Sequence, residues 1–268
     1  MKSVLIAATG VLALSLGSAH AASTSAPLSV DVIPSGSTSC TSAPCPGSIL
    51  PGGTSGWIVG FDDEFPGTSL NTNKWYVPPD GSSSFGDLQS CSTILSVNSG
   101  TMSMVHPGAP DNYGCDIHTY FQATFGYYEA NVKTSNYPNG WGGFWILNTG
   151  VNNCAGNFEY GFEADIIETN VPASEQHLFW DGYGSCEQHR TVASGLPHED
   201  TFHVYGLWVQ PTGMTFYVDG VQTGYYAYNF PGGVFNDGVQ EYMILSNTYI
   251  SGTTDNGLYA HWVRFYHQ

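Results

Sequence analysis

Positive charge is the scarcest feature of this 268-residue chain. Only 5 residues are Lys or Arg, against 22 Asp or Glu, which gives a formal net charge of -17. A chain with so few bases has no basic patch to neutralise phosphates, so we expect no nucleic-acid partner and no binding to an anionic membrane. The negative field of the chain would also repel polyanions, so any polymer that it binds should be neutral.

Charged residues of either sign are few as well. They make up 10% of the chain, whereas a typical soluble domain has about 25%. With 41% hydrophobic and 14% aromatic residues, the chain is too apolar to be disordered and long enough for a self-sufficient core. Because few bases limit positive self-repulsion when carboxylates are protonated, we expect the protein to work in an acidic medium.

Long hydrophobic runs are absent apart from one at the start of the chain. The run from Val4 to Leu16 follows a positively charged start and precedes a small-x-small triplet at 19–21. It is too short to span a bilayer, and the triplet is typical of a cleavage site. We therefore predict a signal peptide over residues 1–21 and a secreted protein, either extracellular or periplasmic.

The chain also lacks the C-x-x-C pairs typical of zinc sites, which disfavours metal binding by its six cysteines. An even number of cysteines in an exported chain favours three disulfides, although six cysteines allow 15 connectivities. Pairing nearest neighbours gives 40–45, 91–115 and 154–186.

Helical periodicity is missing throughout. From Trp57 onward, short runs of β-branched and aromatic residues alternate with turn residues, and the chain has 33 Gly and 15 Pro. This pattern predicts an all-β sandwich or barrel, with a hairpin turn at Asp219-Gly220. We interpret residues 22–56 as an irregular segment rich in Ser, Pro and Gly, and residues 57–268 as one folded domain.

Three acids stand close together in this charge-poor sequence: Glu163, Asp165 and Glu168. On a strand, side chains alternate, so Glu163 and Asp165 would share a face. A β-bulge near 166–167 would bring Glu168 to the same face. Two carboxyls about 5–5.5 Å apart suit retaining glycoside hydrolysis, in which one is ionised and the other holds a proton. An acidic solvated strand and a calcium-binding ladder are the alternatives at this point.

The sequence around these acids resembles glycoside hydrolase family 16, and the resemblance extends from about Phe61 to Tyr266. It implies a β-jelly-roll sandwich with a substrate groove on the concave face. It also implies that Glu163 is the nucleophile, Glu168 the acid/base and Asp165 the assisting carboxylate. The E-x-D-x-x-E spacing matches the bulged, laminarinase-like members, which also include galactan-active enzymes. The matching motifs are Phe61-Asp-Asp-Glu-Phe65, Tyr127-Tyr-Glu-Ala130, Trp141-Gly-Gly-Phe-Trp145, Trp180-Asp-Gly-Tyr-Gly184 and Val263-Arg-Phe-Tyr266.

Three positions depart from the pattern of the family. Asn131 stands where the family usually has Arg, and Phe179 stands where relatives with W-D-G-Y-G often have His. His261 stands where most members have an Asp that often helps to bind a structural calcium. The His at this position argues against the calcium. We expect no metal and no cofactor, with a structural calcium as the alternative.

Aromatic residues near the acids are candidates for substrate binding, because flat rings suit the apolar faces of sugars. We expect Trp145, Trp180, Trp141 and Tyr183 to stack on sugar rings, with packing in the core as the alternative. His177 is a candidate for hydrogen bonding to substrate hydroxyls, and an ordinary surface role is its alternative.

Together these features predict a monomeric, secreted, retaining endo-β-glycosidase that acts on a neutral polysaccharide, β-1,3-glucan or β-1,3-1,4-glucan. A transglycosylase or an enzyme acting on galactan or xyloglucan would use the same chemistry. A non-catalytic lectin is the alternative from another class, although binding alone does not require three clustered acids.

Overall fold

A computed structural model of the protein describes the part of the chain that carries the fold. The described residues are 40–43, 45, 47–53, 55–84, 87–106, 113–134, 140–148, 162–170, 174–181, 188–195, 201–227, 239–249 and 257–268, with the backbone alone at 87, 140, 170, 174–181, 188–190 and 249. All the described residues belong to one compact unit within residues 37–268. The predicted signal peptide lies outside the described residues.

Two antiparallel sheets account for nearly all of the regular structure that is described. The eight-stranded sheet contains, in spatial order, β15 (Val221–Ala227), β14 (Gly213–Val218), β13 (His203–Gln210), β8 (Gly126–Thr134), β17 (Gly257–His267), β6 (Met102–Val105) and β5 (Leu95–Val97), with β1 (Ile58–Asp63) also paired to β17. The nine-stranded sheet contains β12 (Gln188–Ser194), β11 (Ser174–Asp181), β10 (Glu163–Asn170), β9 (Gly140–Leu147), β16 (Glu241–Tyr249), β7 (Tyr113–Ala123), β4 (Asp87–Gln89) and β3 (Ser83–Ser84), with β2 (Trp75–Tyr76) also paired to β7. The short helix α1 (Cys91–Ile94) precedes β5.

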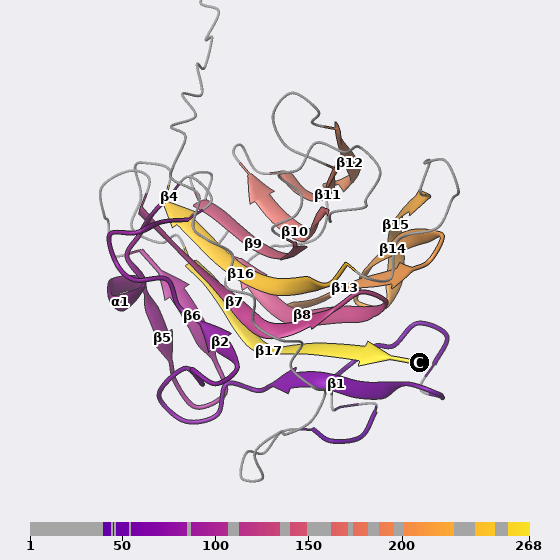
Figure 1. The fold of residues 1–268 in the computed structure, drawn as a ribbon, viewed down its shortest axis with the longest axis horizontal. Coiled ribbons are helices and arrows are strands. Elements are labelled where there is room, and N and C mark those ends of the chain that lie inside the picture. The colour runs from indigo at the N-terminus through magenta and orange to yellow at the C-terminus, as the bar shows by residue number, and fades with distance from the viewer. Residues whose placement is uncertain are drawn as a thin grey trace, which may run out of the picture. The chain divides into compact units, whose positions relative to one another are not determined.

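The two sheets face each other as a sandwich, and both curve in the same direction with the nine-stranded sheet on the inner side (Figure 1). Only β4 and β7 pair in parallel; the other described pairs are antiparallel. The predicted all-β sandwich is therefore confirmed. No helix in the described part of the chain is long and apolar enough to cross a membrane.

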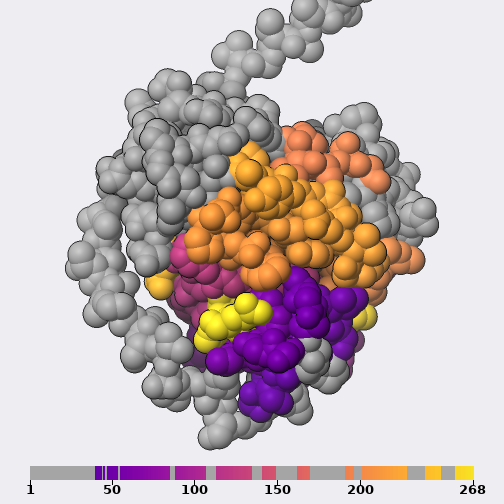
Figure 2. Space-filling view, turned by 90° about the vertical axis from the view of Figure 1, so that its right-hand side faces the viewer, coloured from indigo at the N-terminus to yellow at the C-terminus, as the bar shows by residue number. Residues whose placement is uncertain are grey.

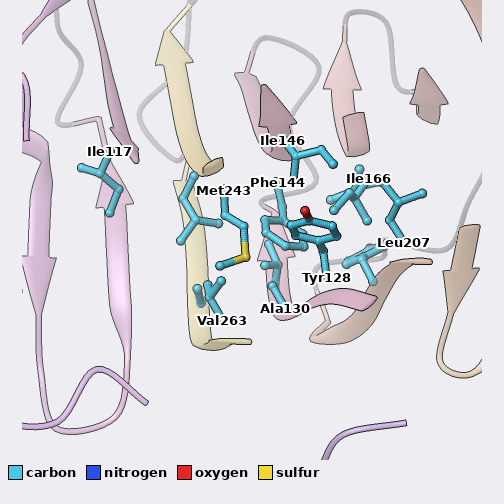
Figure 3. Packing of buried hydrophobic residues seen from close by; sticks show 14 of the residues in the cluster. Ile117, Tyr128, Ala130, Phe144, Ile146, Ile166, Leu207, Met243 and Val263 are labelled. Atoms are coloured by element: carbon cyan, nitrogen blue, oxygen red, sulfur yellow. The ribbon is translucent and has the colours of Figure 1, made fainter. Parts of the chain in front are cut away.

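Alternate residues of the central strands fill the space between the sheets. Tyr128 and Ala130 of β8 meet Phe144 and Ile146 of β9, and all four are fully buried (Figure 3). Full burial of a large apolar side chain contributes about 1.5–3 kcal/mol to the free energy of folding. Because every second residue faces the core between the sheets, the remaining residues of β9 and β10 lie on the opposite face of the nine-stranded sheet. We call this face, which is turned away from the other sheet, the outer face.

The predicted turn at Asp219-Gly220 is confirmed as the connection between β14 and β15. Val218 pairs with Val221, so the loop has two residues, and both have positive φ (49° and 77°). A two-residue hairpin with positive φ at both positions favours an Asp-Gly sequence, since glycine adopts such a conformation without strain.

Two of the three predicted disulfides are present. Cys40 is bonded to Cys45, and Cys91 at the start of α1 is bonded to Cys115 of β7. The third predicted pair, Cys154 with Cys186, lies outside the described residues.

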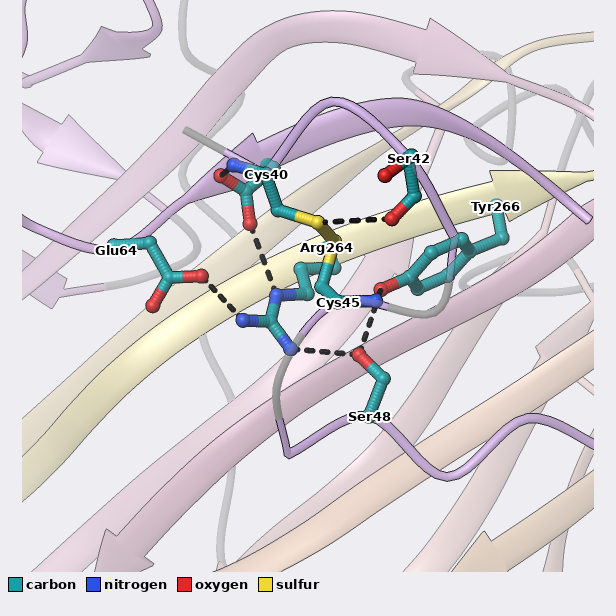
Figure 4. The surroundings of a disulfide bond; sticks show 8 residues. Cys40, Ser42, Cys45, Ser48, Glu64, Arg264 and Tyr266 are labelled. Atoms are coloured by element: carbon teal, nitrogen blue, oxygen red, sulfur yellow. Dashed lines mark hydrogen bonds and ion pairs between the residues drawn. A yellow bond between two sulfur atoms is a disulfide. The ribbon is translucent and has the colours of Figure 1, made fainter. Parts of the chain in front are cut away.

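The Cys40–Cys45 loop packs against the outer face of the eight-stranded sheet and is held there by buried polar groups (Figure 4). Cys40 N donates to Asp62 Oδ2 (3.0 Å), and Cys45 N donates to Tyr266 Oη (3.4 Å). Arg264, 1% exposed, donates from Nε to Asp62 Oδ1 (2.9 Å) and from a terminal nitrogen to Ser48 Oγ (2.6 Å).

The chain continues from this loop across the same face toward the β14–β15 hairpin. Ile49 N donates to Glu129 Oε2 (3.4 Å), and a Cβ at Gly220 would come within 2.4 Å of Ile49 Cγ2. Figure 2 shows this early segment in indigo, beside the hairpin in orange and the end of β17 in yellow. A segment that is irregular in composition thus completes the outer layer of the eight-stranded sheet.

Candidate active site

The acidic motif occupies strand β10, and its register contains the predicted bulge. On the neighbouring strand β9, Asp165 pairs with Trp145 and Ile167 pairs with Phe144. Two steps along β10 therefore match a single step along β9, so β10 carries one extra residue at 166–167. The register of β10 against β11 shifts between Asp165 and Glu168 as well.

This bulge sorts the side chains of β10 onto two faces. Ala164, Ile166 and Ile167 are fully buried in the core between the sheets. Glu163 and Asp165, which alternate with them, lie on the outer face of the nine-stranded sheet, and the extra residue brings Glu168 to that face too. Asp165 is 5% and Glu168 9% exposed, so neither carboxyl is freely solvated.

Trp145 lies on the face of the acids but is largely covered. It is the partner of Asp165 on β9, it is 7% exposed, and its indole Nε1 donates to Ser246 Oγ (2.9 Å). It packs in a small apolar cluster separate from the main core, with Leu147, Tyr242 and Ile244. The ring therefore forms part of the floor around the acids, with only a small area accessible to a sugar.

Trp141 is 41% exposed and contacts the motif directly. Its indole Nε1 donates to Glu168 Oε1 at 2.6 Å. Stacking was the only role predicted for Trp141; the register between β9 and β10 is what places its N–H at a carboxylate. A donor at this distance favours the ionised carboxylate and fixes its orientation.

For the other residues predicted to bind substrate, either the backbone alone is described or the residue lies outside the described part of the chain. Trp180 pairs with Glu163 in the register of β10 with β11, so the two positions are adjacent. His177 lies on β11 between the partners of Asp165 and Glu168. Their side chains are outside the description, and Tyr183 lies outside the described residues altogether.

Tyr242 is a site residue that the sequence analysis missed. It is 8% exposed on β16, in the apolar cluster around Trp145. Burial, the neighbouring Glu241 and the carboxylate of Glu163 raise the pKa of the Tyr242 hydroxyl, which therefore stays protonated near the acids. Nothing local in the sequence marks Tyr242, because β16 is far from the motif along the chain.

The residue that replaces the expected calcium-binding Asp is engaged by neutral groups. His261 Nδ1 lies 2.9 Å from Asn131 Oδ1, so two of the positions that depart from the family pattern contact each other. The imidazole also stacks on Phe202, with ring centroids 3.7 Å apart. Calcium takes oxygen ligands, so the imidazole of His261 cannot supply the ligand that an Asp would provide. The described residues hold no group of three or more His, Cys, Asp or Glu that could bind a metal ion.

Comparison with known proteins identifies the family of the chain. A family model described as Glycosyl hydrolases family 16 matches residues 89–235, which is more than half of the chain and includes the whole motif. The chain belongs to glycosyl hydrolases family 16. Membership makes this protein a glycoside hydrolase.

Two kinds of relative are similar to this family 16 member. Beta-porphyranase E of Zobellia galactanivorans is 29% identical over 255 residues, which cover 77% of this chain and 85% of that protein. An endo-beta-1,3-glucanase from Pyrococcus furiosus has a TM-score of 0.59 and 20% identity, covering 78% of this chain and 94% of its own. Porphyranase B of Zobellia galactanivorans has a TM-score of 0.59 and 19% identity, and the match covers 78% of this chain and 92% of that protein's chain. These structures confirm the β-jelly-roll fold.

Proposed function

We propose that this family 16 enzyme is a secreted, retaining endo-β-glycosidase that hydrolyses a neutral polysaccharide, β-1,3-glucan or β-1,3-1,4-glucan. The observation that carries the proposal is the bulge of β10, which brings three carboxyls to one face of the sheet. A lectin needs no such alignment, whereas hydrolysis with retention needs a nucleophile and an acid in the same place. Secretion is supported by the apolar run at 4–16 and by the two disulfides.

The proposed reaction has two steps. In the first, Glu163 attacks the anomeric carbon while Glu168 gives its proton to the leaving oxygen, so the glycosidic bond breaks and a glycosyl ester forms. In the second, Glu168 takes a proton from water, which attacks the same carbon and releases Glu163. Asp165 stands between the two on the same face. Because it is 5% exposed, its carboxyl interacts with both neighbours with little screening by water.

The chemistry of the described surroundings favours a neutral substrate. Around the three acids the described side chains are acidic, aromatic, aliphatic or hydroxyl-bearing, including Trp141, Trp145, Tyr242 and Ser246. The chain as a whole carries a formal net charge of -17. A galactan is the second candidate, because beta-porphyranase E is among the relatives of this chain.

Product release from a panel of polysaccharides tests the proposed function. The mature protein would be incubated with laminarin, lichenan, xyloglucan, agarose, porphyran and κ-carrageenan at pH 4 to 7, with Glu163→Gln as control. Release of oligosaccharides from laminarin or lichenan, absent in the control, would support a glucanase, and release from porphyran or agarose would assign the second candidate. No release from any polymer, with binding retained, would contradict an enzyme and favour a lectin.

The bond from Trp141 to Glu168 leads to a prediction about pH dependence. Trp141→Phe keeps a large ring but removes the N–H donor, so protonation of Glu168 becomes easier. Since Glu168 must be protonated to begin the reaction, the alkaline limb of the kcat/KM profile should move to higher pH by about half to one unit. The matched control is Trp145→Phe, whose indole donates to Ser246 and not to an acid. Alkaline limbs at the same pH in Trp141→Phe and Trp145→Phe would show that the hydrogen bond from Trp141 does not change the pKa of Glu168.

A further inference from the structure

Glu241 is a fully buried acid that no step of the proposed reaction uses. It is the first residue of β16 and is 0% exposed. Its neighbour Tyr242 lies on the outer face and Met243 lies in the core, so by alternation Glu241 points into the core between the sheets. Neither oxygen of its carboxyl has a hydrogen-bond partner of good geometry in the described part of the chain. Such a group lowers the stability of a fold, so packing alone does not explain Glu241.

Glu241 lies one residue beyond the row that contains the proposed nucleophile. Glu163 pairs with Leu147, and Leu147 pairs with Tyr242, so these three residues form one row across β10, β9 and β16, which are neighbours in the sheet (Figure 1). The next row therefore contains the residue before Glu163, the residue after Leu147 and Glu241 itself. The buried acid thus stands at the end of the sheet where β10 begins.

Asn148, the residue after β9, joins the starts of β10 and β16. Its backbone N donates to the carbonyl oxygen of Phe162, the residue directly before Glu163, at 3.3 Å. Its side-chain amide donates to the carbonyl oxygen of Gln240, the residue directly before Glu241. The two strands are therefore tied to each other across the end of β9.

The backbone N–H of Phe162 acts on the carboxyl of Glu241. Burial raises the pKa of this carboxyl well above its usual range and the N–H lowers it, so the two groups lie close together. The carbonyl and the N–H of Phe162 thus both have a contact at this end of the sheet. Because the rotamers open to a side chain depend on its backbone, holding Phe162 restricts where the carboxyl of Glu163 can lie.

We propose that Glu241 and Asn148 are positioning residues, which hold the start of β10 so that Glu163 stays aimed at the anomeric carbon. Glu241 acts from the core side of the sheet and does not touch substrate. A misplacement of about 1 Å at a reacting group can lower a rate by about a hundredfold, so such support affects turnover directly. This inference rests on the proposed function and deepens it, because it assigns a role to residues behind the nucleophile.

The test compares activity with stability in variants of Glu241. Glu241→Leu puts an apolar group of similar volume in the core, so the Tm should stay equal or rise. On the polymer that the panel identifies, we expect its kcat to fall about tenfold or more, with KM within about twofold of the wild type. Glu241→Gln keeps an oxygen acceptor toward Phe162 and should retain kcat within about threefold.

Asn148→Ala tests the same support from the other side. It removes the amide that donates to Gln240, and because the side chain is half-buried the variant should fold. We expect kcat to fall about three- to tenfold with little change in KM. If Glu241→Leu does not fold, this variant decides: a kcat equal to that of the wild type would overturn the proposal.

The matched control is Glu129→Leu, which makes the same change at a fully buried carboxyl of the other sheet. Ile49 N donates to Glu129, so this variant should have a lower Tm and an unchanged kcat, the reverse of Glu241→Leu. A wild-type kcat in Glu241→Leu, or a loss of kcat that Glu241→Gln shares in full, would overturn the positioning role and leave the proposed function intact. A wild-type enzyme that cleaves no polymer in the panel would instead overturn the proposed function.

Discussion

Glu163→Ala and Glu168→Ala are expected to abolish turnover of the natural polymer, each by at least about a thousandfold, and to respond differently to azide. With an activated aryl β-glycoside, whose leaving group needs no proton, Glu168→Ala should still form the glycosyl ester, and azide should then release it. Both displacements occur at the same carbon, so this product keeps the β configuration. In Glu163→Ala, azide attacks once from the vacated side, so the product is the α-azide.

The anomeric configuration of the two azides is read by nuclear magnetic resonance. If Glu163→Ala gave the β-azide and Glu168→Ala the α-azide, the roles of Glu163 and Glu168 would be exchanged. If azide rescued neither variant, the two-step mechanism would be contradicted. Thermal unfolding of both variants is the control for folding. Asp165→Asn separates the third acid from these roles, since it should slow the reaction without azide rescue.

The sequence was sufficient to predict that the three acids share one face of the sheet, because the information for this placement is local. Alternation along one strand puts Glu163 and Asp165 on one face, and the spacing to Glu168 requires the bulge that the register shows. The all-β sandwich follows equally from short apolar runs separated by turn residues.

What the sequence did not reveal comes from distant pairings. Tyr242 reaches the acids only because β16 pairs with β9, and the role of Trp141 as a donor depends on the register of β9 with β10. Glu241 likewise lies beside the start of β10 only because of these pairings. The composition of residues 22–56 likewise gave no sign that Ser48 and Ile49 complete a buried polar cluster.

That cluster gives the second large prediction, a loss of stability as pH rises. Glu129 is fully buried beneath the segment that follows the Cys40–Cys45 loop, and burial raises the pKa of its carboxyl from 4.5 to about 7. Between these two values the unfolded chain loses the proton while the folded chain keeps it. The free energy of unfolding should therefore fall by about 3 kcal/mol from pH 4 to pH 8 through this group alone.

Glu129→Gln isolates this effect, because glutamine keeps the shape and an oxygen acceptor for Ile49 N but cannot ionise. We expect the variant to match the wild type near pH 4 and to exceed it in stability increasingly toward pH 8, measured by denaturant unfolding at each pH. Asp80→Asn is the matched control: hydrogen bonds from Ser92 lower the pKa of this surface acid, so above about pH 5 it is ionised in both the folded and the unfolded state. Parallel curves for Glu129→Gln and the wild type would mean that Glu129 is already ionised in the folded protein.

The loss of stability with rising pH is consistent with the low number of bases in the chain. Glu241 is buried as well, and burial raises the pKa of its carboxyl, so it acts in the same direction as Glu129. Acid then stabilises the fold through these groups, whereas in most proteins it weakens salt bridges. In this chain acid can weaken few salt bridges, because Arg264 is one of only 5 Lys and Arg residues. A fold whose buried carboxyls prefer the proton, and whose low base content limits positive repulsion, is suited to an acidic medium. The proposed chemistry agrees, because Glu168 must carry a proton when substrate arrives.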